Sequence, residues 1–137
     1  MSRRSAAAVL ASALALTALL GCSSGLNRPV QEVTATTDPH GVQHVRLEAH
    51  SYYWKPNRIV VRAQAPVELA IHNAAFLTPH NFTCLAPEAG INIKRSLSWF
   101  GGTRRVRFIP VRPGEYPFLC GVDSHAKHGM TGVLVVQ

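Results

Sequence analysis

The C-terminal part of the chain contains the segment Tyr116-Pro-Phe-Leu-Cys120-Gly-Val-Asp-Ser-His125-Ala-Lys-His128-Gly-Met130. A thiol, two imidazoles and a thioether therefore lie close together in the sequence. A strand-like run precedes Cys120, and another, at 131–136, follows Met130. Soft sulfur ligands combined with imidazole select copper or zinc over hard cations. The segment therefore predicts a metal-binding loop between two strands.

Two His, one Cys and a weak axial Met form the ligand set of a blue-copper electron-transfer site. The segment supplies Cys120, His125 and Met130, so one His must come from elsewhere. His80 lies in the turn Pro79-His80-Asn81-Phe82, just before another apolar run, and a fold that brings it beside residues 120–130 completes the set. His128 is an alternative to His125, but only Gly129 separates it from Met130. We favour His125, with His128 exposed near the site.

From residue 44 onward the chain reads as short strands separated by turns. Apolar and polar residues alternate, or β-branched residues run together, in the segments 44–49, 58–62, 67–73, 103–108, 116–120 and 131–136. Residues 88–98 are ambiguous between helix and strand. Strands of this length, with turn signals about every ten residues, predict an all-β sandwich or barrel. The apolar share of 47% suits one domain with a buried core.

Residues 44–137 resemble the cupredoxin family, which includes plastocyanin, azurin and small bacterial relatives. The marks are Tyr52-Tyr-Trp-Lys-Pro-Asn57, Pro79-His80-Asn81, Pro113-Gly-Glu-Tyr-Pro-Phe-Leu-Cys120 and His125-x4-Met130-x-Gly132, in this order. Four residues separate Cys120 from His125, where plastocyanin has two, which is closer to azurin; the spacing from His125 to Met130 matches plastocyanin. The resemblance implies a Greek-key β-sandwich, with His80 at an inner strand end and the other three ligands on the loop joining the last two strands.

The resemblance also implies roles for two of these residues. Asn81 is expected to tie its segment to the segment bearing Cys120 and to donate from its backbone to the sulfur. His125 is expected to have its ring edge near the surface and to act as the electron port.

The first 21 residues predict a secretory signal peptide. Arg3 and Arg4 are followed by an apolar stretch at 6–20, which is too short to span a membrane. Leu19-Leu20-Gly21-Cys22 resembles the bacterial lipoprotein cleavage motif, in which the Cys becomes the lipidated N-terminus. Residues 22–43 are predicted to be the lipidated Cys and a flexible tether, and 44–137 the metal-binding domain. The protein is then exported and anchored in the cell envelope, facing the periplasm or the exterior.

The remaining cysteine, Cys84, is predicted to be a buried free thiol, because Cys22 carries lipid and Cys120 binds metal. The 14 Lys and Arg residues, less Arg3 and Arg4, leave 12 basic against 7 acidic residues, a net charge of +5. This balance favours acidic partners without requiring them. No basic run interleaved with aromatic residues indicates a nucleic-acid groove, so we expect no nucleic-acid partner.

The sequence thus predicts a monomeric, lipid-anchored electron carrier with one copper ion, which exchanges electrons with a cytochrome or an oxidase subunit. A copper buffer or chaperone is the alternative. A nitrite reductase or oxidase is disfavoured because the sequence has no His-x-His motif for a second copper site. Terminal oxidases hold a binuclear copper centre between two bridging Cys on one loop, and this loop has only Cys120. A zinc-bound structural domain leaves Met130 unexplained.

Overall fold

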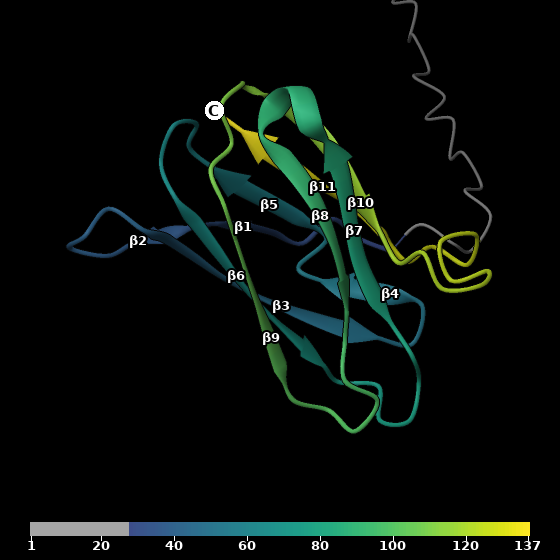
Figure 1. Cartoon of the computed structure of the whole chain (residues 1–137). Helices are drawn as coiled ribbons and strands as arrows, with labels where there is room; N and C mark the ends of the chain where they lie inside the picture. The colour runs from purple at the N-terminus through teal and green to yellow at the C-terminus, as the bar shows by residue number, and fades with distance from the viewer. Residues whose placement is uncertain (1–27) are drawn as a thin grey trace, which may run out of the picture.

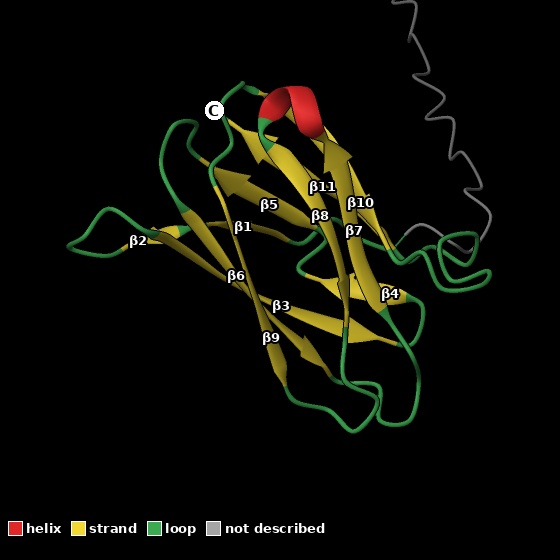
Figure 2. Ribbon diagram, viewed as in Figure 1, coloured by secondary structure: helices red, strands yellow, loops and turns green. Residues whose placement is uncertain are grey.

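The alternation of apolar and polar residues shows which face of each strand is buried. The computed structural model describes residues 28–137. In β6 (Val67–Asn73) the apolar side chains of Val67, Leu69 and Ile71 are all fully buried. Figure 2 shows that strands account for nearly all the regular structure of this part. The prediction of an all-β sandwich is confirmed.

Six strands form the first sheet, in the order β1-β5-β11-β10-β7-β8. Their bounds are β1 (Glu32–Thr34), β5 (Arg58–Val61), β7 (Asn81–Ala86), β8 (Ile91–Ser96), β10 (Gly114–Leu119) and β11 (Thr131–Val136). β5 pairs in parallel with β1 and β11, and the other neighbours are antiparallel. β7 and β10 are therefore neighbours although a long stretch of chain separates them.

The second sheet contains β2 (Thr36–Thr37), β3 (Gln43–His50), β6 and β9 (Thr103–Phe108) in that order, and β4 (Tyr53–Lys55) pairs with β3. β3 and β6 run parallel, whereas β6 and β9 are antiparallel. The sheets cross in Figure 1, and the loops after β10 and before β7 leave the sandwich at the same end.

The core between the sheets includes an aromatic cluster below this end. Trp54, Phe82 and Phe118 are almost completely buried, and their ring centroids lie 5.1 to 6.0 Å apart. Gly132 faces this cluster, because a Cβ built on it would meet the Phe118 ring and lie 2.6 Å from the Asn57 carbonyl oxygen. Only glycine fits there without displacing backbone or ring.

One region differs from the sequence-based expectations, and a second, which the sequence left ambiguous, is resolved by the structure. Residues 32–37, predicted to lie in a flexible tether, form β1 and β2. Pairing holds them, because β1 pairs with β5 and β2 with β3. Just before β1, the Asn57 side chain accepts the Gln31 N–H at 2.8 Å and donates to the Pro29 carbonyl at 3.1 Å. The ambiguous segment 88–98 contains part of a short 3-10 turn, η1 (Pro87–Ala89), followed by β8.

The predicted signal peptide and Cys22 lie outside the described residues. Within residues 28–137, no helix is long and apolar enough to cross a membrane. Cys84 is a buried free cysteine, as predicted. Its burial raises the pKa of the thiol to about 11.

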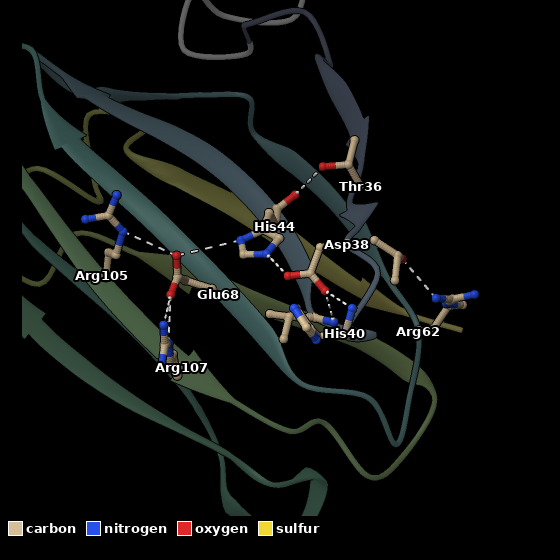
Figure 3. Close-up of polar contacts among 10 residues, drawn as sticks. Thr36, Asp38, His40, His44, Arg62, Glu68, Arg105 and Arg107 are labelled. Atoms are coloured by element: carbon tan, nitrogen blue, oxygen red, sulfur yellow. Dashed lines mark hydrogen bonds and ion pairs between the residues drawn. The ribbon is translucent and has the colours of Figure 1, made fainter.

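A polar network covers the outer face of the second sheet (Figure 3). Glu68 on β6 accepts from the guanidinium groups of Arg107 at 2.7 Å and Arg105 at 3.3 Å. The His44 ring lies between two carboxylates, 2.8 Å from Asp38 and 3.7 Å from Glu68. The hydrogen bond from Arg107 holds the pKa of the Glu68 carboxyl below its ordinary value of 4.5.

This network predicts a loss of stability in acid. A carboxyl whose pKa is lower in the folded state stabilises the protein fully above its unfolded pKa, and this contribution is lost as the pH falls through the folded value. The free energy of unfolding should therefore decrease below pH 4.5, and Glu68→Gln should reduce the decrease. Urea unfolding of the metal-free domain across this range measures it. Glu88→Gln is the control, and an identical pH dependence for Glu68→Gln and the wild type would contradict the prediction.

Candidate metal centre

His80 reaches the site because it immediately precedes β7. Its carbonyl oxygen accepts the Leu97 N–H at 2.9 Å, which fixes the turn before the strand. β7 lies beside β10, with Thr83 opposite Leu119. His80 therefore stands next to Cys120, the residue that follows β10.

Residues 121–130 form a loop that folds on itself. The His125 carbonyl oxygen accepts the backbone N–H groups of His128 and Met130, each at 3.1 Å, and the His125 N–H donates to Val122 at 3.0 Å. The Cys120 N–H donates to the Met130 carbonyl at 3.0 Å, which closes the base of the loop. Local hydrogen bonds thus hold His125 and Met130 relative to Cys120.

Three of the predicted ligands converge. The Cys120 Sγ lies 3.7 Å from His80 Nδ1 and 3.6 Å from His125 Nδ1, and the two nitrogens are 3.2 Å apart. Metal–ligand bonds of about 2.0 to 2.3 Å place the ligand atoms of one ion roughly 3 to 4 Å apart. All three side chains are buried. Their spacing suits three ligands of a single ion.

Met130 is fully buried at the same loop. Its backbone is bonded to both Cys120 and His125, as described above, and its carbonyl also accepts the Trp54 indole N–H at 3.3 Å. The aromatic cluster therefore supports the base of the loop. Sequence reasoning assigned no role to Trp54, because this contact joins residues that are distant in sequence.

Burial keeps His80 neutral over a wide pH range. Desolvation, with the neighbouring His125 ring as a second cause, lowers the pKa of His80 to about 4. A metal binds neutral imidazole, so above this pH the ring is in its binding form. Among the described residues, His80 Nε2 is a buried side-chain atom without a hydrogen-bond partner. The Nδ1 side of the ring therefore carries all its polar contacts, at the site.

Asn81 ties the two halves of the site together, as the resemblance implied. Its backbone N–H donates to Cys120 Sγ at 3.4 Å. Its side-chain Oδ1 accepts the Gly121 N–H at 2.7 Å and the Thr83 hydroxyl at 3.1 Å. Groups that orient a metal ligand in this way tune the site as well as hold it.

Asn81→Ala should destabilise the fold by about 1 to 2 kcal/mol, since two hydrogen bonds lose their acceptor. The backbone N–H to the sulfur remains, so the variant should still bind metal through Cys120. Urea unfolding measures the cost, with Asn92→Ala, at an exposed position on β8, as the control. Equal unfolding free energies for the two variants would show that the Asn81 side chain does not stabilise the site.

His125 is the ligand that was expected to have its ring edge near the surface. It is 7% exposed, against 2% or less for His80, Cys120 and Met130. Tyr52, which is 45% exposed, packs edge-on against His125 with ring centroids 5.1 Å apart. Tyr52 lies outside the loop, so this contact had no direct signal in the sequence.

His128 is exposed and does not belong to the converging set. Its Nδ1 donates to the Ser124 carbonyl at 2.8 Å, and its ring lies 5.1 Å from the Tyr52 ring. The structure therefore groups His125, and not His128, with His80 and Cys120.

The donor set fits copper. One thiolate source and two neutral imidazoles, with a buried thioether beside them, are soft and borderline ligands that suit this metal. In the described part of the chain, this is the one cluster of His, Cys, Asp and Glu side chains close enough to hold an ion. Copper is the cofactor that these residues would hold.

Comparisons with known proteins agree with this geometry. Residues 10–136 match the family model of the cupredoxin-like domain. A comparison with curated protein sequences finds no match.

Solved structures share the fold at low sequence identity. Dithionite-reduced auracyanin from Roseiflexus castenholzii is 21% identical, with a TM-score of 0.61 over 75% of this chain and 98% of its own. Auracyanin A, a "blue" copper protein from Chloroflexus aurantiacus, is 18% identical, with a TM-score of 0.59 over 71% and 100%. The metal-binding domain of the Cu(I)-exporting ATPase CopA from Streptococcus pneumoniae, with Cu(I), is 22% identical, with a TM-score of 0.60 over 80% and 99%.

Proposed function

The chain belongs to the family of cupredoxin-like domains, and on this basis we propose that it is a mononuclear blue-copper electron carrier anchored to a membrane by an N-terminal lipid. The observation that carries the proposal is the buried triangle of His80 Nδ1, Cys120 Sγ and His125 Nδ1. Met130 is proposed as the axial ligand.

The ligand set suits both redox states of copper. Bound copper provides a one-electron couple, for which thiolate and thioether suit Cu(I) and imidazole suits both states. The chain holds the ligands in place: the strand ends fix His80 and Cys120, and the hydrogen-bonded loop fixes His125 and Met130. The Asn81 N–H stabilises negative charge on the Cys120 sulfur, and the buried aromatic cluster excludes water beneath the site.

We propose an electron carrier without substrate turnover of its own. All four proposed ligands are buried, and Tyr52 packs over His125, so the site is arranged for electron exchange through a protein surface. Tyr52 and the exposed His128 lie at the outer end of the path that an electron would take between the site and this surface. The partner would be a redox protein such as a cytochrome or an oxidase subunit, and the carrier would act as a monomer.

Cys22 is the proposed lipid attachment site, with residues 1–21 as the signal peptide. The Leu19-Leu20-Gly21-Cys22 sequence supports this assignment. The domain would then face the periplasm or the cell exterior.

A second candidate is a copper buffer or chaperone. His128 favours it: with Nδ1 bonded to the Ser124 carbonyl, the Nε2 lone pair of this exposed ring is available to capture metal near the site. The fold shared with the CopA metal-binding domain is compatible with this role.

Voltammetry of the copper-loaded domain distinguishes the two functions. An electron carrier should give a reversible one-electron wave and retain its copper through repeated cycles in the presence of a Cu(I) chelator. Loss of copper to the chelator after reduction, without a reversible wave, would favour the buffer. His128→Ala should leave the midpoint potential of the wave unchanged for a carrier, because His128 is not a proposed ligand, but slow copper uptake for a buffer.

A further inference from the structure

Two loops beside the site expose large apolar side chains. They are the loop between β6 and β7, residues 74–80, and the loop between β8 and β9, residues 97–102. Four side chains on these loops are between 55% and 73% exposed: Phe76, Leu77, Trp99 and Phe100. We refer to these four residues as the aromatic tip. Contiguous exposed apolar surface of this kind marks an interaction site.

The aromatic tip is one ordered surface. The Phe76 and Phe100 rings meet edge to face, with centroids 6.1 Å apart, and the Leu77 N–H donates to the Trp99 carbonyl at 2.8 Å. The buried Asn73 amide donates to Thr78 in one loop at 3.0 Å and to Ser98 in the other at 2.8 Å. Buried polar contacts thus fix both loops and hold the apolar side chains in solvent.

The strands that flank the second loop of the aromatic tip are basic. Neither loop contains an acidic residue, and the second loop is flanked by Lys94-Arg95 on one side and Arg104-Arg105 on the other. Arg95 and Arg104 are exposed. Trp side chains are enriched at the membrane–water interface, and basic side chains near a bilayer are attracted to its anionic headgroups. The combination favours a lipid surface.

Arg28, the first residue that the structure describes, lies beside the metal-binding loop. The Arg28 guanidinium sits 3.8 Å from the centre of the Tyr53 ring, beside Lys127 and Gly129 of the metal-binding loop. Cys22 is six residues before Arg28. An extended chain covers at most about 3.3 to 3.6 Å per residue, which limits this connection to roughly 20 Å.

Contacts connect Arg28 to the aromatic tip. The Tyr53 ring stacks on His50 at the end of β3, with centroids 4.6 Å apart. The preceding residue, Ala49, accepts the N–H of Ala74, the first residue of the loop before β7. In Figure 1 both this loop and the metal-binding loop project from the end of the sandwich that carries β4. A bilayer that holds Cys22 therefore lies within roughly 20 Å of Arg28, at this end.

We propose that the aromatic tip is a membrane-contact surface that inserts into the interface of an anionic bilayer. The proposal rests on the lipid-anchored function proposed above. Two attachments, the lipid on Cys22 and the aromatic tip, then orient the domain with the metal-binding loop beside the bilayer. The electron partner is accordingly a protein embedded in, or lying on, the same membrane.

Tryptophan fluorescence tests the proposal on residues 28–137, which contain both sheets and the core between them and lack Cys22. The chain has two Trp residues: Trp99 is exposed, whereas Trp54 is buried in the core. The domain is mixed with vesicles of phosphatidylethanolamine and phosphatidylglycerol, and separately with phosphatidylcholine alone. We expect the tryptophan emission to shift to shorter wavelength with the anionic vesicles and to be quenched by brominated lipid. The substitution Trp99→Phe should abolish this quenching.

Matched variants locate the binding surface. Phe76→Ser with Phe100→Ser should weaken partition into anionic vesicles by at least about tenfold, because two aromatic rings no longer leave water. The double variant Ile109→Ser/Val111→Ser is the control. It also removes two exposed apolar side chains, but from the opposite end of the sandwich, and it should leave partition into anionic vesicles unchanged.

Three results would overturn the proposal. The first is that the domain does not partition into either kind of vesicle. The second is that the two double variants lose the same amount of vesicle partition. The third is that the domain dimerises with increasing concentration, that the Phe76/Phe100 variant abolishes this dimerisation, and that lipid has no effect.

Voltammetry on the same samples separates this inference from the proposed function. A reversible copper wave without vesicle binding refutes only the membrane contact, and vesicle binding without a wave refutes only the electron carrier.

Discussion

Replacing Cys120 by serine is expected to abolish the intense visible absorption band of the copper-loaded domain. This band arises from charge transfer between the thiolate and Cu(II), and Cys120 supplies the sulfur that lies within 3.7 Å of both His80 and His125. A serine hydroxyl is a hard ligand that stays protonated near neutral pH. Copper titration followed by visible absorption and electron paramagnetic resonance measures the change, and the narrow copper hyperfine splitting should be lost with the band.

Cys84→Ser is the matched control. Cys84 is also buried, but it does not belong to the metal cluster, so this variant should keep the band and the narrow splitting. Circular dichroism confirms that both variants are folded. A band that survives Cys120→Ser would mean that the loop binds copper through its histidines, and the copper buffer would then become the better assignment.

Phe118→Ala is expected to lower the free energy of unfolding by about 3 to 5 kcal/mol, the range for removing a buried aromatic side chain. Phe118 is fully buried and packs against Phe82 and Trp54, at 5.1 and 6.0 Å between ring centroids. The lost ring leaves a cavity two residues before Cys120. Urea unfolding of the metal-free domain measures the cost.

Leu85→Ala is the control, because Leu85 lies in the same sheet but is 59% exposed, and its cost should stay within about 0.5 kcal/mol. Phe118→Leu keeps most of the buried volume and serves as the milder variant if Phe118→Ala does not fold. Similar costs for Phe118→Leu and Leu85→Ala would show that the aromatic cluster is not the support of the metal site.

Several features of the protein follow from local sequence. Alternation of apolar residues predicted β6 and β9, and an apolar, β-branched run predicted β11, at the positions the structure shows. The grouping of Cys120, His125 and Met130 was also visible, because a short loop between two strands keeps its residues close together in space. The sequence also favoured His125 over His128, because a single glycine between His128 and Met130 makes it difficult for both side chains to reach one ion.

Other features required the tertiary structure. His80 and Cys120 are 40 residues apart, and the order of β7 and β10 within the sheet brings them together. The sequence suggested the pair because the ligand set lacked one His, and the family resemblance implied the same residue. Residues 32–37 have no strong apolar period of their own. They become strands because β5 and β3 offer them hydrogen-bond partners, and the Asn57 side chain holds the chain at Gln31, just before them.

The surface of the site was the least predictable part. Tyr52 covers His125, and Trp54 bonds to the Met130 carbonyl, through contacts between segments that are remote in the chain. The sequence by itself determined the strands and the chemistry of the ligands, because strand pattern and ligand type are properties of short segments. Tertiary structure decided which ligands meet and which ring faces solvent, because these depend on how the two sheets pack.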